Sequence, residues 1–177
     1  MPVAESLATH SIAQQLLAEF EAQAPVTRRF LERLPNDKLT WKPHEKSMTA
    51  GQLAYHLAFV PGGVARASQS LRNQPPAFNH PQPSGIQEVL NVFDESIAAV
   101  RQILPQYDDA AMNETWRVVN GDREIIAMPR HEFLHQIGLN HWYQHRGQFS
   151  VYLRLLGIAV PASWGPSADE NPFAPRP

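Results

Sequence analysis

Apolar residues recur every three or four positions in four stretches of this chain, and that spacing predicts four amphipathic helices. The first stretch runs roughly from Thr9 to Leu34. Pro25 is expected to kink or interrupt it, because proline removes a helical hydrogen bond. The expected inward positions of this helix are Ile12, Leu16, Phe20, Phe30, Leu31 and Leu34.

The second and third helices are each predicted to begin at a capping box, in which a hydroxyl and an amide satisfy free backbone donors. The second begins at Thr49-Ala50-Gly51-Gln52 and the third at Ser84-Gly85-Ile86-Gln87. A kink is expected in the second at Pro61-Gly62-Gly63. The apolar stripe of the second is Leu53, Leu57, Val60, Val64, Ala67 and Leu71, and that of the third is Ile86, Leu90, Phe93, Ile97, Val100 and Leu104.

Two other kinds of segment separate the helices. Apolar residues between Thr115 and Met128 flank the dipeptide Asn120-Gly121, which suits the positive φ angles of a tight turn, so a small β-hairpin is expected there. Prolines gather in the stretches 75–83 and 161–177, which are expected to be irregular.

The last helix is expected to follow Pro129 and to run to about Leu156, with Gly157 as its C-terminal stop. Four amphipathic helices with one inserted hairpin predict an all-α fold, a four-helix bundle. A length of 177 residues predicts a single domain, 1–177.

Composition excludes several classes of function. The chain has 15 Lys and Arg against 17 Asp and Glu, a net charge of −2, so no nucleic-acid or membrane partner is expected. It has no cysteine, which leaves its 8 histidines and its carboxylates to build any soft-metal site. No signal sequence and no run of about 18 apolar residues is visible, so the expected compartment is the cytoplasm.

The last predicted helix carries a string that matches metzincin zinc proteases. His131, Glu132 and His135 form HExxH, which Gly138 and His141 extend to the longer pattern. No methionine follows His141, helices rather than a twisted sheet precede the string, and the helical period continues past Gly138. In a continuous helix His131 and His141 lie about 15 Å apart along the axis, too far to share an ion. The continuing stripe is Leu134, Gly138, His141, His145, Gln148, Tyr152 and Leu155.

A different set of histidines suits a metal. His141 and His145 lie one turn apart on one face, and His56 on the buried side of the second helix is the candidate third ligand. Three imidazoles leave a coordination position open, as in catalytic sites. The alternative is three core histidines held by ordinary hydrogen bonds. The metal is favoured because it satisfies one nitrogen of each ring.

The remaining histidines give weaker signals. His10, His44 and His80 are expected to be solvated, and His131 and His135 to form a surface pair or a second, weaker site.

Other polar and aromatic residues have two possible roles each. Arg146 is expected to form a structural salt bridge, or alternatively to meet a carboxylate or an anionic substrate group. Trp142 and Tyr55 are expected to pack as aromatic residues, with pocket lining as the alternative. Asp169 and Glu170 are either solvated tail charges or docked on the helices.

Several segments together resemble the DinB-like (YfiT-like) superfamily of metalloenzymes: Thr49–Leu57, Asn140–Gln148, Val151–Gly157 and Trp164–Glu170. The resemblance implies a four-helix bundle, a homodimer and a divalent metal held at the positions of His56, His141 and His145. Relatives of known activity include transferases that use low-molecular-weight thiols such as bacillithiol or mycothiol.

The leading hypothesis is therefore a metal-dependent thiol S-transferase that acts on a small-molecule substrate. The reacting group would be a substrate thiol or a metal-bound water, and no catalytic side chain is identified because Glu132 lies too far along the helix. A metal-dependent hydrolase and a non-enzymatic metal- or ligand-binding stress protein are the alternatives. Zinc, nickel, iron and manganese all suit three nitrogen donors.

Overall fold

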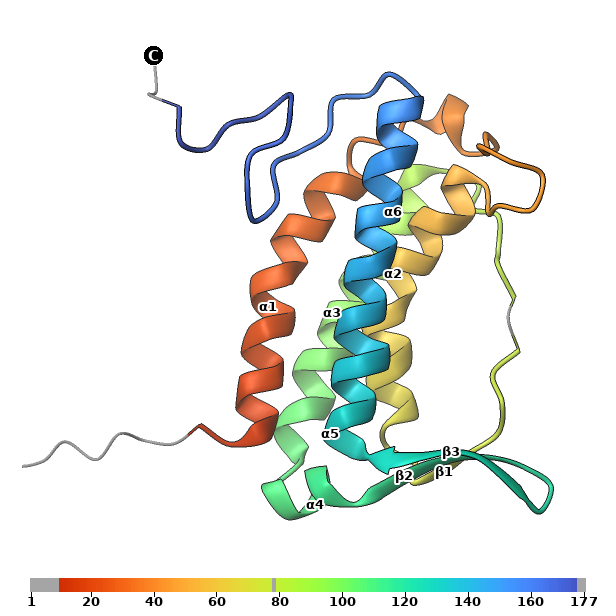
Figure 1. The fold of residues 1–177 in the computed structure, drawn as a ribbon, viewed down its shortest axis with the longest axis vertical. Coiled ribbons are helices and arrows are strands. Elements are labelled where there is room, and N and C mark those ends of the chain that lie inside the picture. The colour runs from red at the N-terminus through yellow and green to blue at the C-terminus, as the bar shows by residue number, and fades with distance from the viewer. Residues whose placement is uncertain (1–9, 78, 175–177) are drawn as a thin grey trace, which may run out of the picture.

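The computed structural model describes residues 10–77 and 79–174, and it is mostly helical with a small sheet at one end (Figure 1). Four long helices run alongside one another and bury their apolar stripes in a shared core (Figure 1). They are α1 (Ile12–Leu31), α2 (Ala50–Ala67), α3 (Ile86–Ile103) and α6 (His141–Leu155). Shorter elements are α4 (Asp109–Asn113), α5 (Arg130–Phe133) and the 3-10 turns Asn36–Lys38 and Leu104–Gln106.

The helix starts show which capping signals act locally. Thr49 caps α2 in the predicted capping box with Gln52. The capping box predicted for α3 is wrong: Gly85 is its N-cap, and the Ser84 hydroxyl donates instead to Glu88. The first backbone N–H of α3 is satisfied from a distant loop, where the Asn36 side-chain oxygen accepts it at 2.8 Å.

Neither internal proline ends its helix. α1 begins at a capping box on Ser11 and continues through Pro25, whereas the predicted start at Thr9 lies outside the described residues. α2 continues through Pro61. The N–H of Gly62 donates to the Ser96 hydroxyl of α3 at 2.6 Å, so the two helices exchange a hydrogen bond at this point.

Some predicted inward positions lie elsewhere. Leu71 lies beyond the end of α2, and Leu155 is 59% exposed, while Leu153 is fully buried in its place. α6 packs against both α1 and α2, so its buried residues do not form a single row with a spacing of three and four.

The predicted hairpin is confirmed as strands β2 (Thr115–Asn120) and β3 (Arg123–Pro129), which pair antiparallel. Its turn lies one residue later than expected, because Asn120 pairs with Arg123 and the loop is Gly121-Asp122. Only the glycine of that loop has a positive φ, at 60°. The sequence did not predict the short strand β1 (Arg72–Asn73), which pairs parallel with β2.

Aromatic and charged contacts attach the hairpin to the ends of the helices. The ring of Trp116 stacks on Phe133 with centroids 3.6 Å apart, and its indole N–H donates to the Ala67 carbonyl at the end of α2. Arg130 is buried beneath the hairpin, where it donates to the Ser68 carbonyl and pairs with Glu114. The hairpin therefore closes one end of the helical core.

The last helical run is continuous from Arg130 to Leu155, as predicted, but its middle was not foreseen. Residues Leu134–Asn140 are π-helical and join α5 to α6. A π segment places one more residue in the turn than an α-helix does, and such segments are frequent at functional sites. The run ends at Gly157, whose φ of 71° and flanking backbone hydrogen bonds form a left-handed C-cap.

None of the helices in residues 10–77 and 79–174 is both long enough and apolar enough to span a bilayer.

We expect Gly62→Ala to lower the free energy of unfolding by about 1–3 kcal/mol, the usual cost of overpacking. A Cβ on Gly62 would lie 2.6 Å from the Cα of Ser96, so the backbones of α2 and α3 would have to separate. Urea unfolding followed by circular dichroism measures the change.

Gly147→Ala is the matched control, because a Cβ there meets nothing within 4 Å. This variant should keep or raise stability, by up to about 1 kcal/mol, since alanine favours a helix over glycine. Equal stability of the two variants would contradict close packing at Gly62.

Candidate metal centre

Three histidine rings from two helices meet at one point. His56 lies on α2, and His141 and His145 lie in the first turns of α6. The Nε2 atom of His141 is 3.1 Å from the Nε2 atoms of both other rings. One ring nitrogen of each histidine lies within 4.8 Å of the other two, and no other such group of three possible ligands occurs in the described part of the chain.

A buried tryptophan sets the register of the two helices at this point. Trp142 is fully buried, and its indole N–H donates to the Leu57 carbonyl at 2.9 Å. Each partner directly follows a histidine of the group, so the bond holds His56 and His141 opposite each other. The ring of Trp142 packs near Phe20 and Phe93 in the core, which confirms the expected aromatic packing.

Gly138 has a packing role in the π segment. A Cβ on this residue would lie 3.0 Å from the ring of Phe20, so the glycine lets α1 approach closely. The chain stays helical there, and so Gly138 does not mark the turn that a metzincin needs.

The separation of the ring nitrogens fits a bound ion. Two nitrogens bound at about 2.0–2.1 Å with tetrahedral angles lie about 3.3 Å apart, close to the observed 3.1 Å. The Nδ1 atom of His145 is 3.0 Å from the side-chain oxygen of Gln148. An amide oxygen only accepts hydrogen bonds, so Nδ1 must carry the proton of the neutral ring in order to donate to it. The Nε2 atom of His145 is then unprotonated, as a metal ligand must be. The chemistry of this donor set therefore suits a divalent cation.

Burial keeps these rings neutral. Burial is the largest cause, and together with the neighbouring His145, His141 and His80 it lowers the pKa of His56 to about 4. Burial is also the main cause that lowers the pKa values of His141 and His145. Neutral imidazoles are the form that binds metals, so the site is ready for a cation at pH 7.

A fourth histidine lies beside the group, although no motif or spacing in the sequence indicated it. His80 was expected to be solvated; its side chain is exposed, but its ring lies 5.7 Å from that of His56. Gln52 on α2 donates to the His80 carbonyl at 2.9 Å and so holds the loop against the helix. A cavity of about 240 Å³ opens here; its described lining is Tyr55, His56, Phe59, Ala77, Asn79, His80 and Pro81.

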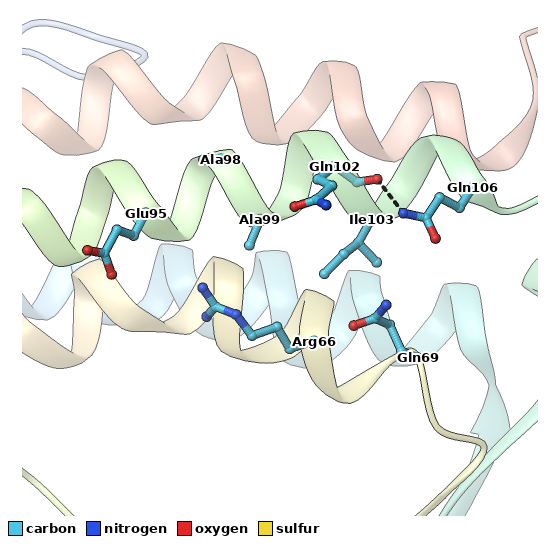
Figure 2. A pocket seen from close by; sticks show the side chains of 8 residues that line it. All are labelled: Arg66, Gln69, Glu95, Ala98, Ala99, Gln102, Ile103 and Gln106. Atoms are coloured by element: carbon cyan, nitrogen blue, oxygen red, sulfur yellow. Dashed lines mark hydrogen bonds between the residues drawn. The ribbon is translucent and has the colours of Figure 1, made fainter.

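A larger hollow of about 470 Å³ lies between α2 and α3, and it is a weaker candidate (Figure 2). Its lining includes Arg66, Glu95, Gln102 of α3 and Gln106 of the following 3-10 turn, whose side chain donates to the Gln102 carbonyl (Figure 2). Arg66 lies ten residues after His56, about 15 Å along α2. The hollow therefore lies away from His56, and none of the three histidines lines it.

The metzincin string is not assembled into a site. The Nδ1 atom of His131 faces the Met112 carbonyl at 3.2 Å, and His135 is exposed. Glu132 accepts from Gln136 on the same helical run. In the described residues, His131 and His135 belong to no group of three metal ligands, so the predicted second site lacks a third donor.

The structure also decides between the alternatives for four other residues. Arg146 makes no ion pair with a described carboxylate, so the expected salt bridge is wrong. Asp169 docks on the helices by pairing with Arg154, and Glu170 accepts from the Ala162 N–H. Tyr55 lines the cavity beside His56.

Known proteins resemble this chain in sequence and in fold. The model of the DinB family matches residues 5–171. The "Uncharacterized protein YrdA" of Bacillus subtilis (strain 168) is 26% identical over 155 residues, which cover 87% of this chain and 89% of that protein. A DinB-like protein from Bacillus cereus ATCC 10987 superposes with a TM-score of 0.66 at 21% identity, over 84% of this chain and 95% of the other. The DinB-like protein YjoA from Bacillus subtilis superposes with a TM-score of 0.64 at 18% identity, over 84% of this chain and 96% of the other.

We expect the metal-free protein to lose stability as the pH falls from about 7 to 4. The pKa of His56 is lowered from 6.5 to about 4 on folding, so the unfolded chain binds more protons between these values. The contribution of neutral His56 to the free energy of unfolding is complete above pH 6.5 and is lost as the pH falls toward 4. Urea unfolding of chelator-treated protein across this range measures it.

His56→Gln should flatten this pH dependence, whereas His135→Gln, which removes an exposed histidine outside the group, should leave it unchanged. The same slope in His56→Gln as in the wild type would contradict the burial argument.

Gln148→Leu should weaken divalent-metal binding by about 10- to 100-fold, the usual effect of losing a group that orients a ligand. The variant removes the acceptor of His145 Nδ1 and leaves all three Nε2 atoms in place. Competition with a chromogenic chelator measures the affinity. Gln144→Leu, on an exposed position of α6, is the control that should bind as the wild type does.

Proposed function

This chain belongs to the DinB family, and from that membership and the meeting of three imidazoles we propose that it is a metal-dependent enzyme. The observation that carries the proposal is the convergence of the Nε2 atoms of His56, His141 and His145. We propose that these three atoms hold one divalent ion. Zinc, nickel, iron and manganese all suit this donor set.

Within that class we propose a thiol S-transferase. A divalent ion supplies Lewis acidity, which lowers the pKa of a thiol or a water that reaches it. The chain has no cysteine, so the sulfur has to come with the substrate. The substrate sulfur forms a bond to an electrophilic carbon of a second substrate, whose leaving group departs with the bonding electron pair, and the thiol proton passes to solvent.

The residues around the site support the binding of a small molecule. Tyr55 and Phe59 give the cavity beside His56 aromatic walls, and Phe59 is 47% exposed. His80 lies at the same cavity, on the loop that Gln52 holds. A volume of about 240 Å³ suits the reacting part of a small thiol or electrophile.

We propose that the four long helices form a four-helix bundle and that the protein is a homodimer, as the family resemblance implies. From the net charge of −2 we also propose that it works without a nucleic-acid or membrane partner, and we propose the cytoplasm as its compartment.

Elemental analysis of purified protein should find about one divalent ion per chain. His56→Ala, His141→Ala and His145→Ala should each lose most of it, because each removes one of three ligands. His135→Ala and Glu132→Ala are matched controls from the metzincin string and should keep the metal. Metal loss in these two controls with retention in His56→Ala would overturn the three-histidine site.

Transfer of bacillithiol or mycothiol to monochlorobimane tests the reaction. The wild type should accelerate it, and a chelator or His141→Ala should abolish the acceleration. Chelator-sensitive hydrolysis of an ester without any thiol would identify the hydrolase alternative. Metal binding with neither activity would identify a binding protein.

A further inference from the structure

A second polar site faces α1 and the C-terminal tail, and it centres on a buried arginine. Arg146 is 8% exposed. Its Nη1 atom donates to the side-chain oxygen of Gln23 at 2.7 Å and to the hydroxyl of Thr27 at 3.2 Å. Its guanidinium lies 5.3 Å from the centre of the Tyr143 ring. All of these partners are neutral.

The lack of a counter-charge distinguishes Arg146 from the arginines around it. Arg29 and Arg33 both pair with Glu170, and Arg154 pairs with Asp169. The equally buried Arg130 pairs with Glu114. No described carboxylate oxygen lies within 4.0 Å of the Arg146 guanidinium. A buried charge without an opposite charge is costly, and burial accordingly lowers the pKa of Arg146.

Arg146 is one of the residues that line a cavity with room for a small anion. The cavity holds about 220 Å³, and its walls include Gly147 and Ser150 of α6 and Ser163 and Gly165 of the tail. None of the residues that line it is acidic. The Nε and Nη2 atoms of Arg146 make no hydrogen bond to a described residue, and neither is fully enclosed, so both are available to a further partner.

We propose that this cavity binds a small oxyanion, a phosphate, sulfate or carboxylate group, with Arg146 as its anchor. The two free nitrogens form the planar fork that recognises two oxygens of one anion. The Ser163 hydroxyl, which makes no hydrogen bond to a described residue, is a further donor on the wall. The site does not use the three histidines, so it is independent of the proposed metal.

Titration calorimetry with inorganic phosphate, at constant ionic strength and with chelator-treated protein, tests the proposal. The wild type should bind one phosphate saturably, and acetate in place of phosphate shows whether a carboxylate suffices. Arg146→Gln should abolish binding, and Arg146→Lys, which keeps the charge without the fork, should weaken it by about tenfold or more. Arg66→Gln removes an exposed arginine of α2 and should bind as the wild type does.

Gly147→Leu tests the cavity without touching Arg146. The position is exposed and lines the cavity, and a Cβ there meets nothing within 4 Å, so the variant should fold, with its leucine side chain taking up space in the cavity. Loss of phosphate binding in this folded variant supports the site. The absence of saturable binding of phosphate, sulfate and acetate by the wild type, or wild-type affinity in both Arg146→Gln and Gly147→Leu, overturns it.

Discussion

The hydrogen bond from the Trp142 indole to the Leu57 carbonyl determines where α6 lies along α2. A slide of one residue on either helix would break this bond and carry His56 away from His141. The bond is buried, so its loss would leave an unsatisfied donor and acceptor, which costs about 1–3 kcal/mol for each group. The convergence of three ring nitrogens is therefore a consequence of core packing around one tryptophan.

The environment around the histidines differs from that of the arginines. The histidine group is half-buried and holds no carboxylate, so its rings stay neutral and offer lone pairs. The acidic tail residues Asp169 and Glu170 pair with Arg29 of α1, with Arg33 just beyond it and with Arg154 of α6, and these pairs hold the tail on the helices. The neutral histidine rings and the ion pairs with the tail therefore lie on different sides of α6. Arg146 belongs to neither set, because it is charged but pairs with no carboxylate among the described residues.

Local signals in the sequence were sufficient for much of the fold. The three-to-four spacing of apolar residues located all four long helices, and Thr49 with Gln52 marked the start of α2. Asn120-Gly121 located the hairpin to within one residue. The spacing of His141 and His145 was enough to pair them, because residues one turn apart on a helix always share a face.

Other features depend on partners that are distant in the chain. Asn36 caps α3 across fifty residues, and His80 lies beside His56 because Gln52 holds its loop, which no periodicity reveals. The π segment arises where Gly138 meets Phe20 of another helix, and the isolation of Arg146 is known only once the neighbouring acids are seen to pair elsewhere. The helices and the candidate ligands can be predicted from the amino-acid order alone, because these follow from hydrogen bonding and spacing within a few residues. Which groups meet depends on how the helices pack together, so it is visible only in the folded chain.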